Sequence, residues 1–229
     1  MSIIVIIVVA IILSFLLSVV KDNKESRKVS KEIEREFNKV DFTQVESVDE
    51  EQKLNLTNAN LILKISDLHN QEKFIECIEA CNRLLLNDQN HDYVLLMKAD
   101  SLSLYGGKIK SVKLLEEAVD ILEKLEKTKY KHQEILFVLG DTWIRLAFAK
   151  GKSENDENKI IECATISSNY YYKAHQMDLN NESILVELAF AKYIAGADDD
   201  AFFYINKAKA INPYNNRVIE IYNKLYSIK

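Results

Sequence analysis

Cys77 and Cys81 are the residues of this chain whose spacing most directly suggests chemistry. They lie four residues apart, which places two thiols on one face of a helix and could serve redox chemistry or metal binding. The chain has three cysteines, and an odd number does not suit a disulfide framework. The favoured interpretation is therefore that Cys77 and Cys81 are small core residues.

The histidines and the other polar residues offer no recognisable catalytic or metal-binding pattern. The four histidines are isolated, without the spacing of metal ligands: His69, His91, His132 and His175. No nucleophile, base and orienting group can be assembled from spacing alone. We therefore predict no catalytic residue, no metal site and no cofactor, and a protein that is not an enzyme.

A short segment at Gly151, Lys152 and Ser153 resembles the end of a phosphate-binding loop. Its partner glycine is missing, because Leu146 stands five residues earlier, and no strand-like segment precedes it. The net charge of −5 also argues against a general nucleic-acid binder. We therefore predict neither a nucleotide nor a nucleic acid as a ligand.

The elements that must position these residues are helices. Five glycines and one proline are too few for a β-rich fold with many turns. From Asn55 onward, apolar residues recur at helical spacing, with no strand-like alternation. With 48% hydrophobic and 28% charged residues, the 229-residue chain suits one medium domain with appendages.

The amino terminus carries an apolar run without charge at residues 2–20, long enough to span a bilayer as one helix. We predict a retained anchor at 1–20; a cleaved signal peptide is the alternative. Lysines and arginines follow at once, which predicts the amino terminus outside and the soluble domain in the cytoplasm. A bacterial inner membrane is the first choice, and an organellar outer membrane would also fit. Residues 21–54 are predicted to form a charged stalk.

The clearest helical pattern runs from Glu182 to Pro213. Apolar residues at helical spacing fill both halves, and Gly196 with the following aspartates interrupts them. The segment therefore predicts two short amphipathic helices joined by a tight turn.

This segment resembles a tetratricopeptide repeat, abbreviated TPR. The residues at matching spacings are Leu185, Leu188, Ala189, Gly196, Ala201, Ile205, Ala208 and Pro213. One such hairpin cannot bury its own apolar face, so neighbouring hairpins are expected. The resemblance implies an all-α fold: a right-handed α-solenoid of about four TPR-like hairpins with a C-terminal capping helix, preceded by one transmembrane helix.

The remaining hairpins match the family pattern less closely. The repeat domain is predicted over 55–229, with pairs at 55–91, 92–132, 133–181 and 182–214 and a cap at 215–229. The first pair matches weakly, with Phe74, Ile78 and Cys81 at the family positions of its second helix. In the third pair, Gly140 stands where two helices meet. The polar segment at 151–159 stretches that pair and is expected to loop out or lengthen both helices.

In this family, the first helix of each pair lines a concave face. The resemblance implies a partner-binding groove formed by Tyr93, Leu96, Asp100, Phe137, Asp141, Arg145, Phe190 and Tyr193, with Phe137 at its centre. Asp100 and Asp141 would favour a ligand with a basic residue beside apolar anchors.

The functional hypothesis is a membrane-anchored scaffold or adaptor. Residues 2–20 would hold it at the membrane, and the groove would bind a protein segment, in assembly or quality control of a membrane complex. The alternative hypothesis is a permanent structural accessory subunit of a larger membrane complex.

Overall fold

The computed structural model describes residues 50–128, 132–154 and 156–227. The chain divides into two compact units, Met1–Asn60 and Leu61–Lys229. The anchor predicted at 2–20 lies outside the described residues, as does the stalk up to residue 49. Among the helices that are described, none combines the length and the apolar character needed to cross a membrane.

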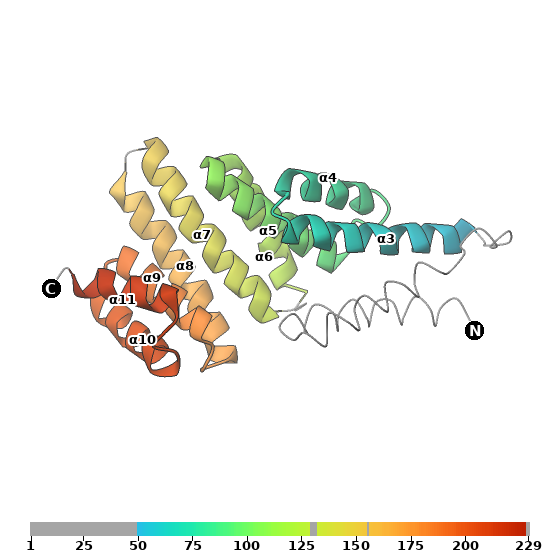
Figure 1. Ribbon diagram of the computed structural model, residues 1–229. Helices are drawn as coiled ribbons and strands as arrows, with labels where there is room; N and C mark the ends of the chain where they lie inside the picture. The colour runs from blue at the N-terminus through green and yellow to red at the C-terminus, as the bar shows by residue number, and fades with distance from the viewer. Residues whose placement is uncertain (1–49, 129–131, 155, 228–229) are drawn as a thin grey trace. The chain divides into compact units, whose positions relative to one another are not determined.

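The described residues form nine α-helices and no strand (Figure 1). Their bounds are α3 Glu50–Asn70, α4 Phe74–Leu85, α5 Asp92–Ile109, α6 Val112–Glu126, α7 His132–Glu154, α8 Glu157–Met177, α9 Glu182–Ile194, α10 Asp198–Ile211 and α11 Asn216–Tyr226. Of these, α3 begins within the predicted stalk and runs across the boundary between the two units.

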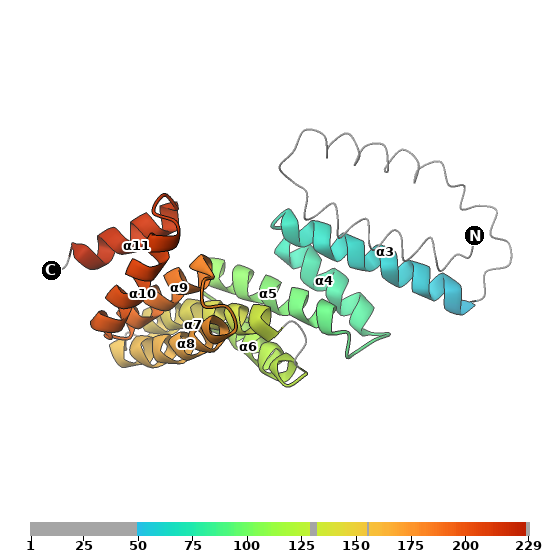
Figure 2. The same cartoon turned by 90° about the horizontal axis from the view of Figure 1, so that it is seen from below.

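Within the unit Leu61–Lys229, consecutive helices pack as hairpins, and each hairpin rests on the next (Figures 1 and 2). The pairs α5–α6, α7–α8 and α9–α10 pack most extensively, and α11 lies against α9 and α10. The residues of α3 from Leu61 onward share a core with α4 and α5. This confirms the predicted all-α solenoid of TPR-like hairpins.

Polar side chains at the ends of the connections define where several helices begin. Ser111, Asn181 and Asn215 each accept a hydrogen bond from a backbone amide in the first turn of the helix that follows. Such caps satisfy amides that have no partner within the helix. At the end of α9, Gly196 has a φ of +77°, a conformation that glycine adopts without steric cost.

The α7–α8 hairpin is long because the polar segment at 151–159 is almost entirely helical. α7 continues to Glu154, and α8 begins at Glu157 with the side chain of Asp156 as its cap. Gly151 lets the helices converge, because a Cβ atom there would lie 2.4 Å from the Ile160 side chain. Of the two expectations for this segment, the structure shows the lengthened helices.

In the first pair, the predicted register of α4 is wrong by three residues. Cys77, Cys81 and Leu84 are buried, whereas Phe74 and Ile78 are only half-buried. Cys77 and Cys81 share a buried cluster with Ile65 of α3 and Val94 of α5. In this repeat, Cys77 occupies the position where the family has a small residue, usually alanine. A pattern that searches for alanine does not detect it.

Candidate functional site

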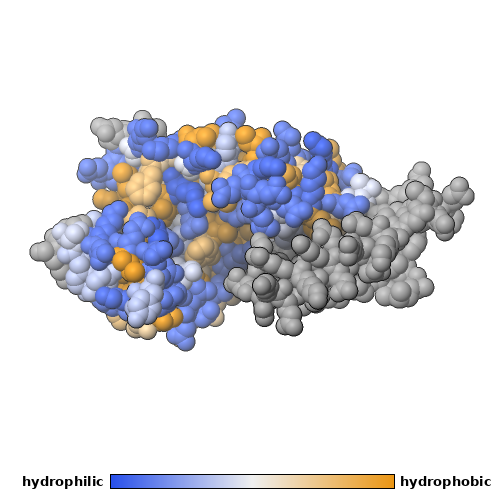
Figure 3. Space-filling view, in the orientation of Figure 1, coloured by the Kyte–Doolittle hydropathy of each residue, from blue (hydrophilic) through white to orange (hydrophobic). Residues whose placement is uncertain are grey.

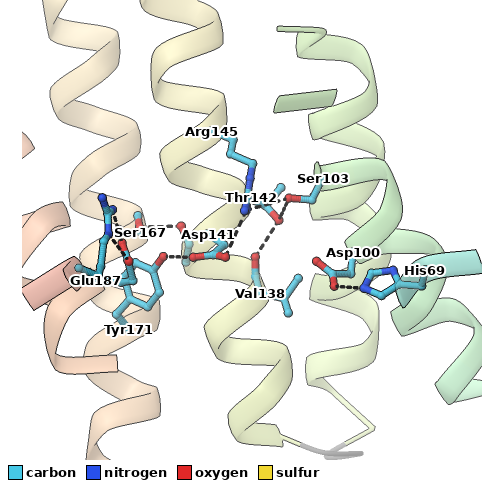
Figure 4. Close-up of polar contacts among 12 residues, drawn as sticks. His69, Asp100, Ser103, Val138, Asp141, Thr142, Arg145, Ser167, Tyr171 and Glu187 are labelled. Atoms are coloured by element: carbon cyan, nitrogen blue, oxygen red, sulfur yellow. Dashed lines mark hydrogen bonds and ion pairs between the residues drawn. The ribbon is translucent and has the colours of Figure 1, made fainter. Parts of the chain in front are cut away.

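Polar side chains form a row across α5, α7, α8 and α9, next to several of the predicted groove residues (Figure 4). Asp141 of α7 is central to this row. Its carboxylate accepts a short hydrogen bond from the hydroxyl of Tyr171 on α8 and pairs with Arg145, 3.3 Å away. Burial raises the pKa of Asp141, and it also raises the pKa of Tyr171 well above its usual value. The Tyr171 hydroxyl therefore stays a donor at neutral pH.

Arg145 links this row to α5. Its Nη1 atom donates to the hydroxyl of Ser103 at 3.3 Å, and the same hydroxyl accepts from Thr142 at 2.9 Å. The aliphatic part of Arg145 lies on Gly107, where a Cβ atom would come within 2.6 Å of Cδ. The arginine therefore reaches α5 only because position 107 has no side chain.

A second polar group joins the first pair to α5. His69 contacts Asp100 through Nε2 at 3.2 Å and the Ser101 hydroxyl through Nδ1 at 3.1 Å. The hydrogen bond to Asp100 is the main reason that the pKa of His69 rises to about 9. At neutral pH, the Asp100 carboxylate thus faces an imidazolium.

A third ion pair connects α9 to the capping helix. Arg217 of α11 donates to both carboxylate oxygens of Glu187, at 2.9 and 3.0 Å, and also contacts Glu220. The hydrogen bonds to Glu187 raise the pKa of Arg217 further, so it stays charged. Two parallel bonds of this kind fix the orientation of both side chains.

Two of the predicted groove aromatics pack on other rings. Phe137 meets the buried ring of Tyr171 edge-on, with 5.5 Å between centroids. Phe190 is only 7% exposed and stacks with Phe148, which is 44% exposed.

Cations of the capping helix lie over the same Phe190 ring. Arg217 is 5.0 Å and Lys224 is 5.4 Å from its centroid. We call Phe148, Phe190, Arg217 and Lys224 the aromatic–cation patch.

Two predicted groove residues, Leu96 and Phe190, are buried and do not lie on an open surface. Leu96 is 2% exposed and packs against Leu122 and Ile135, because the neighbouring pair covers it. Phe190 is buried because Phe148 and α11 cover its ring. Tyr93 and Tyr193 are half-buried at the edges of the apolar clusters.

The expected preference for a basic ligand stays a prediction, and the structure gives both carboxylates internal partners. Asp100 already has His69 as a partner, and Asp141 already has Arg145. A basic ligand would have to displace these internal cations.

The sequence did not reveal His69, Phe148, Glu187 or Arg217 as members of these groups. Each acts through a residue about 30 to 42 positions away, the length of a repeat. The repeat register could have indicated these groups. Asp100 and Asp141 occupy equivalent positions of their repeats, and the register indicates which adjacent helices could supply partners for them.

Solved structures show the same fold. The thermophilic TPR protein TTC0263 of Thermus thermophilus superposes with a TM-score of 0.60 at 13% identity, over 75% of this chain and 82% of that one. A point mutant of MamA superposes with a TM-score of 0.57 at 13% identity, over 76% of this chain and 88% of that one. No protein-family model and no curated protein sequence matches this chain. The chain thus has the fold of TPR proteins.

Proposed function

We propose that residues 61–229 form a protein-binding scaffold, and that a partner segment lies along the face made by α5, α7, α9 and α11. The TPR fold supports this, because stacked repeats create extended concave surfaces on which such proteins bind partners. The side of the molecule seen in Figure 3 is largely polar, with separate apolar patches, so a partner would be held at discrete anchor points.

The aromatic–cation patch is the observation that carries this proposal. Phe148 is a half-exposed ring on a buried ring, and the ammonium of Lys224 is close by. An apolar side chain of a partner can stack there and bury the exposed face of Phe148. Lys224 would then meet a carboxylate next to that anchor. The proposed ligand is therefore an extended segment with an apolar anchor and an acidic neighbour.

Residues 2–20 would hold this scaffold at a membrane. The uncharged run and the basic residues after it support a single span with the amino terminus outside and the repeats in the cytoplasm. Protease added to the outside of sealed cells should then leave the repeats intact until the membrane is opened. Digestion from outside alone would reverse the proposed orientation.

Recovery of partners by the full-length protein in mild detergent tests the binding face. The test variant combines Phe148→Ala and Lys224→Glu. The matched control combines Phe203→Ala and Lys207→Glu on α10, where a 55% exposed ring also has a lysine at 4.9 Å. Losing an anchor of this kind costs about 2 kcal/mol, or roughly thirtyfold in affinity.

We expect the Phe148 variant to lose its partners and the Phe203 variant to keep them. Equal recovery by both variants, or equal loss, would show that the patch is not the binding site. Release on dilution supports a reversible adaptor, whereas persistent co-purification would indicate a permanent subunit.

A further inference from the structure

The two cysteines of α4 lie in a polar cluster that the binding face does not use. Ser101 of α5 donates its hydroxyl hydrogen to Cys77 Sγ at 3.2 Å, and the same hydroxyl contacts His69 Nδ1 at 3.1 Å. His69 Nε2 contacts Asp100 at 3.2 Å. Cys81 interacts with Cys77 along the same face of the helix. The contacts therefore run from the Asp100 carboxylate through the His69 imidazole and the Ser101 hydroxyl to the Cys77 thiol.

These contacts stabilise a negative charge on Cys77. The Asp100 carboxylate can only accept, so His69 Nε2 carries a proton, and a protonated Nδ1 can donate to Ser101. Interactions with Cys81, and to a lesser extent with His69 and Ser101, lower the pKa of Cys77 to about 5 against the opposing effect of burial, while the interaction with Cys77 raises the pKa of Cys81. The neutral thiol has a weaker alternative, donating to the Ile65 carbonyl at 3.5 Å.

Charged groups face this pair from both neighbouring helices. α3 contributes His69, and α5 contributes Asp100 and Lys98. Lys98 lowers the pKa of Cys81 slightly and is itself paired with Glu117 at 3.2 Å. The arrangement thus gives the two thiols different roles: Cys77 is the more acidic, and Cys81 keeps its proton.

We propose that Cys77 and Cys81 form a peroxide-sensitive thiol pair, in which Asp100, His69 and Ser101 activate Cys77. The Cys77 thiolate attacks one oxygen of a peroxide; the S–O bond forms, the O–O bond breaks, and hydroxide leaves. The sulfur is oxidised by two electrons to a sulfenic acid. Cys81 then attacks that sulfur, so that the S–S bond forms, the S–O bond breaks, and its proton leaves with the hydroxide as water.

The disulfide would distort α4. Cβ atoms four residues apart on a helix are about 5–6 Å from each other. A disulfide requires about 3.5–4.5 Å between them. Closing this difference breaks the regular helix between Cys77 and Cys81, so oxidation would loosen the packing of α4 between α3 and α5.

Both sulfur atoms are fully buried, so a peroxide reaches Cys77 through a local opening that must leave the contact between Ser101 and Cys77 in place. The pair belongs to the first hairpin of the unit Leu61–Lys229, and the ends of a repeat array open more readily than its middle. Cys163 on α8 is also buried and serves as the internal reference thiol. Any difference in reactivity between Cys77 and Cys163 therefore does not come from solvent exposure in the closed state.

The first experiment treats the full-length protein with hydrogen peroxide and maps its peptides. We expect loss of two hydrogens within the peptide that contains Cys77 and Cys81, with Cys163 intact. The rate should change little between pH 9 and pH 6, whereas an ordinary thiol slows about tenfold per unit below its pKa. Equal oxidation of all three cysteines, or an ordinary pH profile at Cys77, would overturn the proposal.

Variants separate the two steps. Alanine is used because a serine hydroxyl at position 77 could replace the thiol in the contacts with Ser101 and the Ile65 carbonyl. Cys81→Ala should stop at the sulfenic acid on Cys77, which dimedone traps, whereas Cys77→Ala should leave Cys81 unmodified. Trapping on Cys81 in the Cys77→Ala variant would contradict the assigned order.

A second measurement does not depend on access of an oxidant. Thiolate absorbance of the Cys163→Ala protein is titrated with pH, alone and with Ser101→Ala or Asp100→Asn added. The midpoint should lie well below that of an ordinary cysteine and move up in both added variants. A midpoint that neither variant moves would show that Ser101 and Asp100 do not act on the thiol.

Discussion

Asp141 shows how one carboxylate can join three helices of a repeat array. It lies on α7, accepts from Tyr171 on α8, and orients Arg145 toward Ser103 on α5. A partly buried carboxylate of this kind would cost stability without its partners. Because each partner comes from a defined residue, the contacts help to fix the register between the second and third pairs.

Gly107→Ala tests these contacts at a residue that has no side chain of its own. The new Cβ atom would collide with the Arg145 side chain, so the arginine must leave Asp141 and Ser103. We expect a loss of about 1–3 kcal/mol in the free energy of unfolding, measured with denaturant. In an Arg145→Ala background, the same change should be neutral or stabilising, because alanine favours helix over glycine by up to about 1 kcal/mol. A penalty of the same size in both backgrounds would mean that the collision is not the cause.

Gly140→Ala tests the contact between α7 and α8. The added methyl group would lie 2.7 Å from ring atoms of Tyr171, which is fully buried and has no room to move. Overpacking of this kind costs about 1–3 kcal/mol. Thermal unfolding should show a clear drop in Tm. An unchanged Tm would mean that the two helices are less closely packed than described.

His69 and His175 should affect stability in opposite directions with pH. The folded-state pKa of His69 is raised from 6.5 to about 9, so its contribution is complete below pH 6.5 and is lost as pH rises through 9. Burial lowers the pKa of His175, so its contribution is present above pH 6.5 and is lost as pH falls. The cost of His69→Gln in Tm should therefore shrink toward high pH, and the cost of His175→Asn should shrink toward low pH. Costs that do not vary with pH would argue against both assignments.

At the scale of elements, periodicity predicted helices well and registers less well. The segment from Glu182 to Pro213 contains α9, the turn at Gly196, and α10, as its apolar spacing indicated. In α4, the buried positions follow Cys77 and Cys81 instead of Phe74 and Ile78. Spacing alone could not distinguish these registers, since both place apolar residues at helical intervals.

The connection between α7 and α8 should tolerate insertions. Only two residues separate Glu154 from Glu157, and they lie at the end of two long helices. A Gly-Ser linker of about ten residues placed there should change Tm little, because loop closure depends only weakly on length. The matched control places the same linker after Gly196, where the Ala197 amide donates to the Lys192 carbonyl at 2.9 Å and closes the end of α9. We expect the control to be clearly less stable, and equal Tm values would contradict this difference.

At the scale of the whole array, α11 closes the apolar core of the last pair. Leu225 is buried in the cluster formed by α9, α10 and α11, while Asn223 on the same helix is exposed. Leu225→Asp should destabilise the protein by more than about 3 kcal/mol, because it buries an unpaired charge. Asn223→Asp adds the same side chain at the surface and should be nearly neutral. Thermal unfolding of both variants is the measurement. A large drop in Tm for Leu225→Asp alone indicates that α11 is a cap, whereas similar Tm values for both variants would indicate a loosely attached tail.

The candidate site could be predicted only in outline. The repeat register correctly placed Asp100, Asp141 and Phe190 on the first helices of their pairs. Whether such a residue is open or covered depends on its neighbours in space. Phe190 is covered because Phe148 and α11 reach across it, and no pattern within one repeat contains that information.

Repeat proteins are often treated as strings of equivalent modules. The second and third pairs can be aligned on Ala99 and Gly140, which occupy the same position of the family pattern. Their contacts across the α5–α7 seam are nevertheless not equivalent, because Arg145 needs both the hydroxyl of Ser103 and the bare backbone of Gly107.

The α7 side of this seam fits the α5 side, but α7 would not fit against a second copy of itself. The third hairpin therefore could not be duplicated in tandem without losing these contacts. In a second copy placed after the first, Arg145 would face the residues of α7 that correspond to Ser103 and Gly107. These are Ile144, which offers no hydroxyl, and Phe148, whose ring would fill the space that the arginine needs. Gene duplication of this hairpin would therefore yield a mismatched seam, so the side chains between α5 and α7 favour the observed order of these two hairpins.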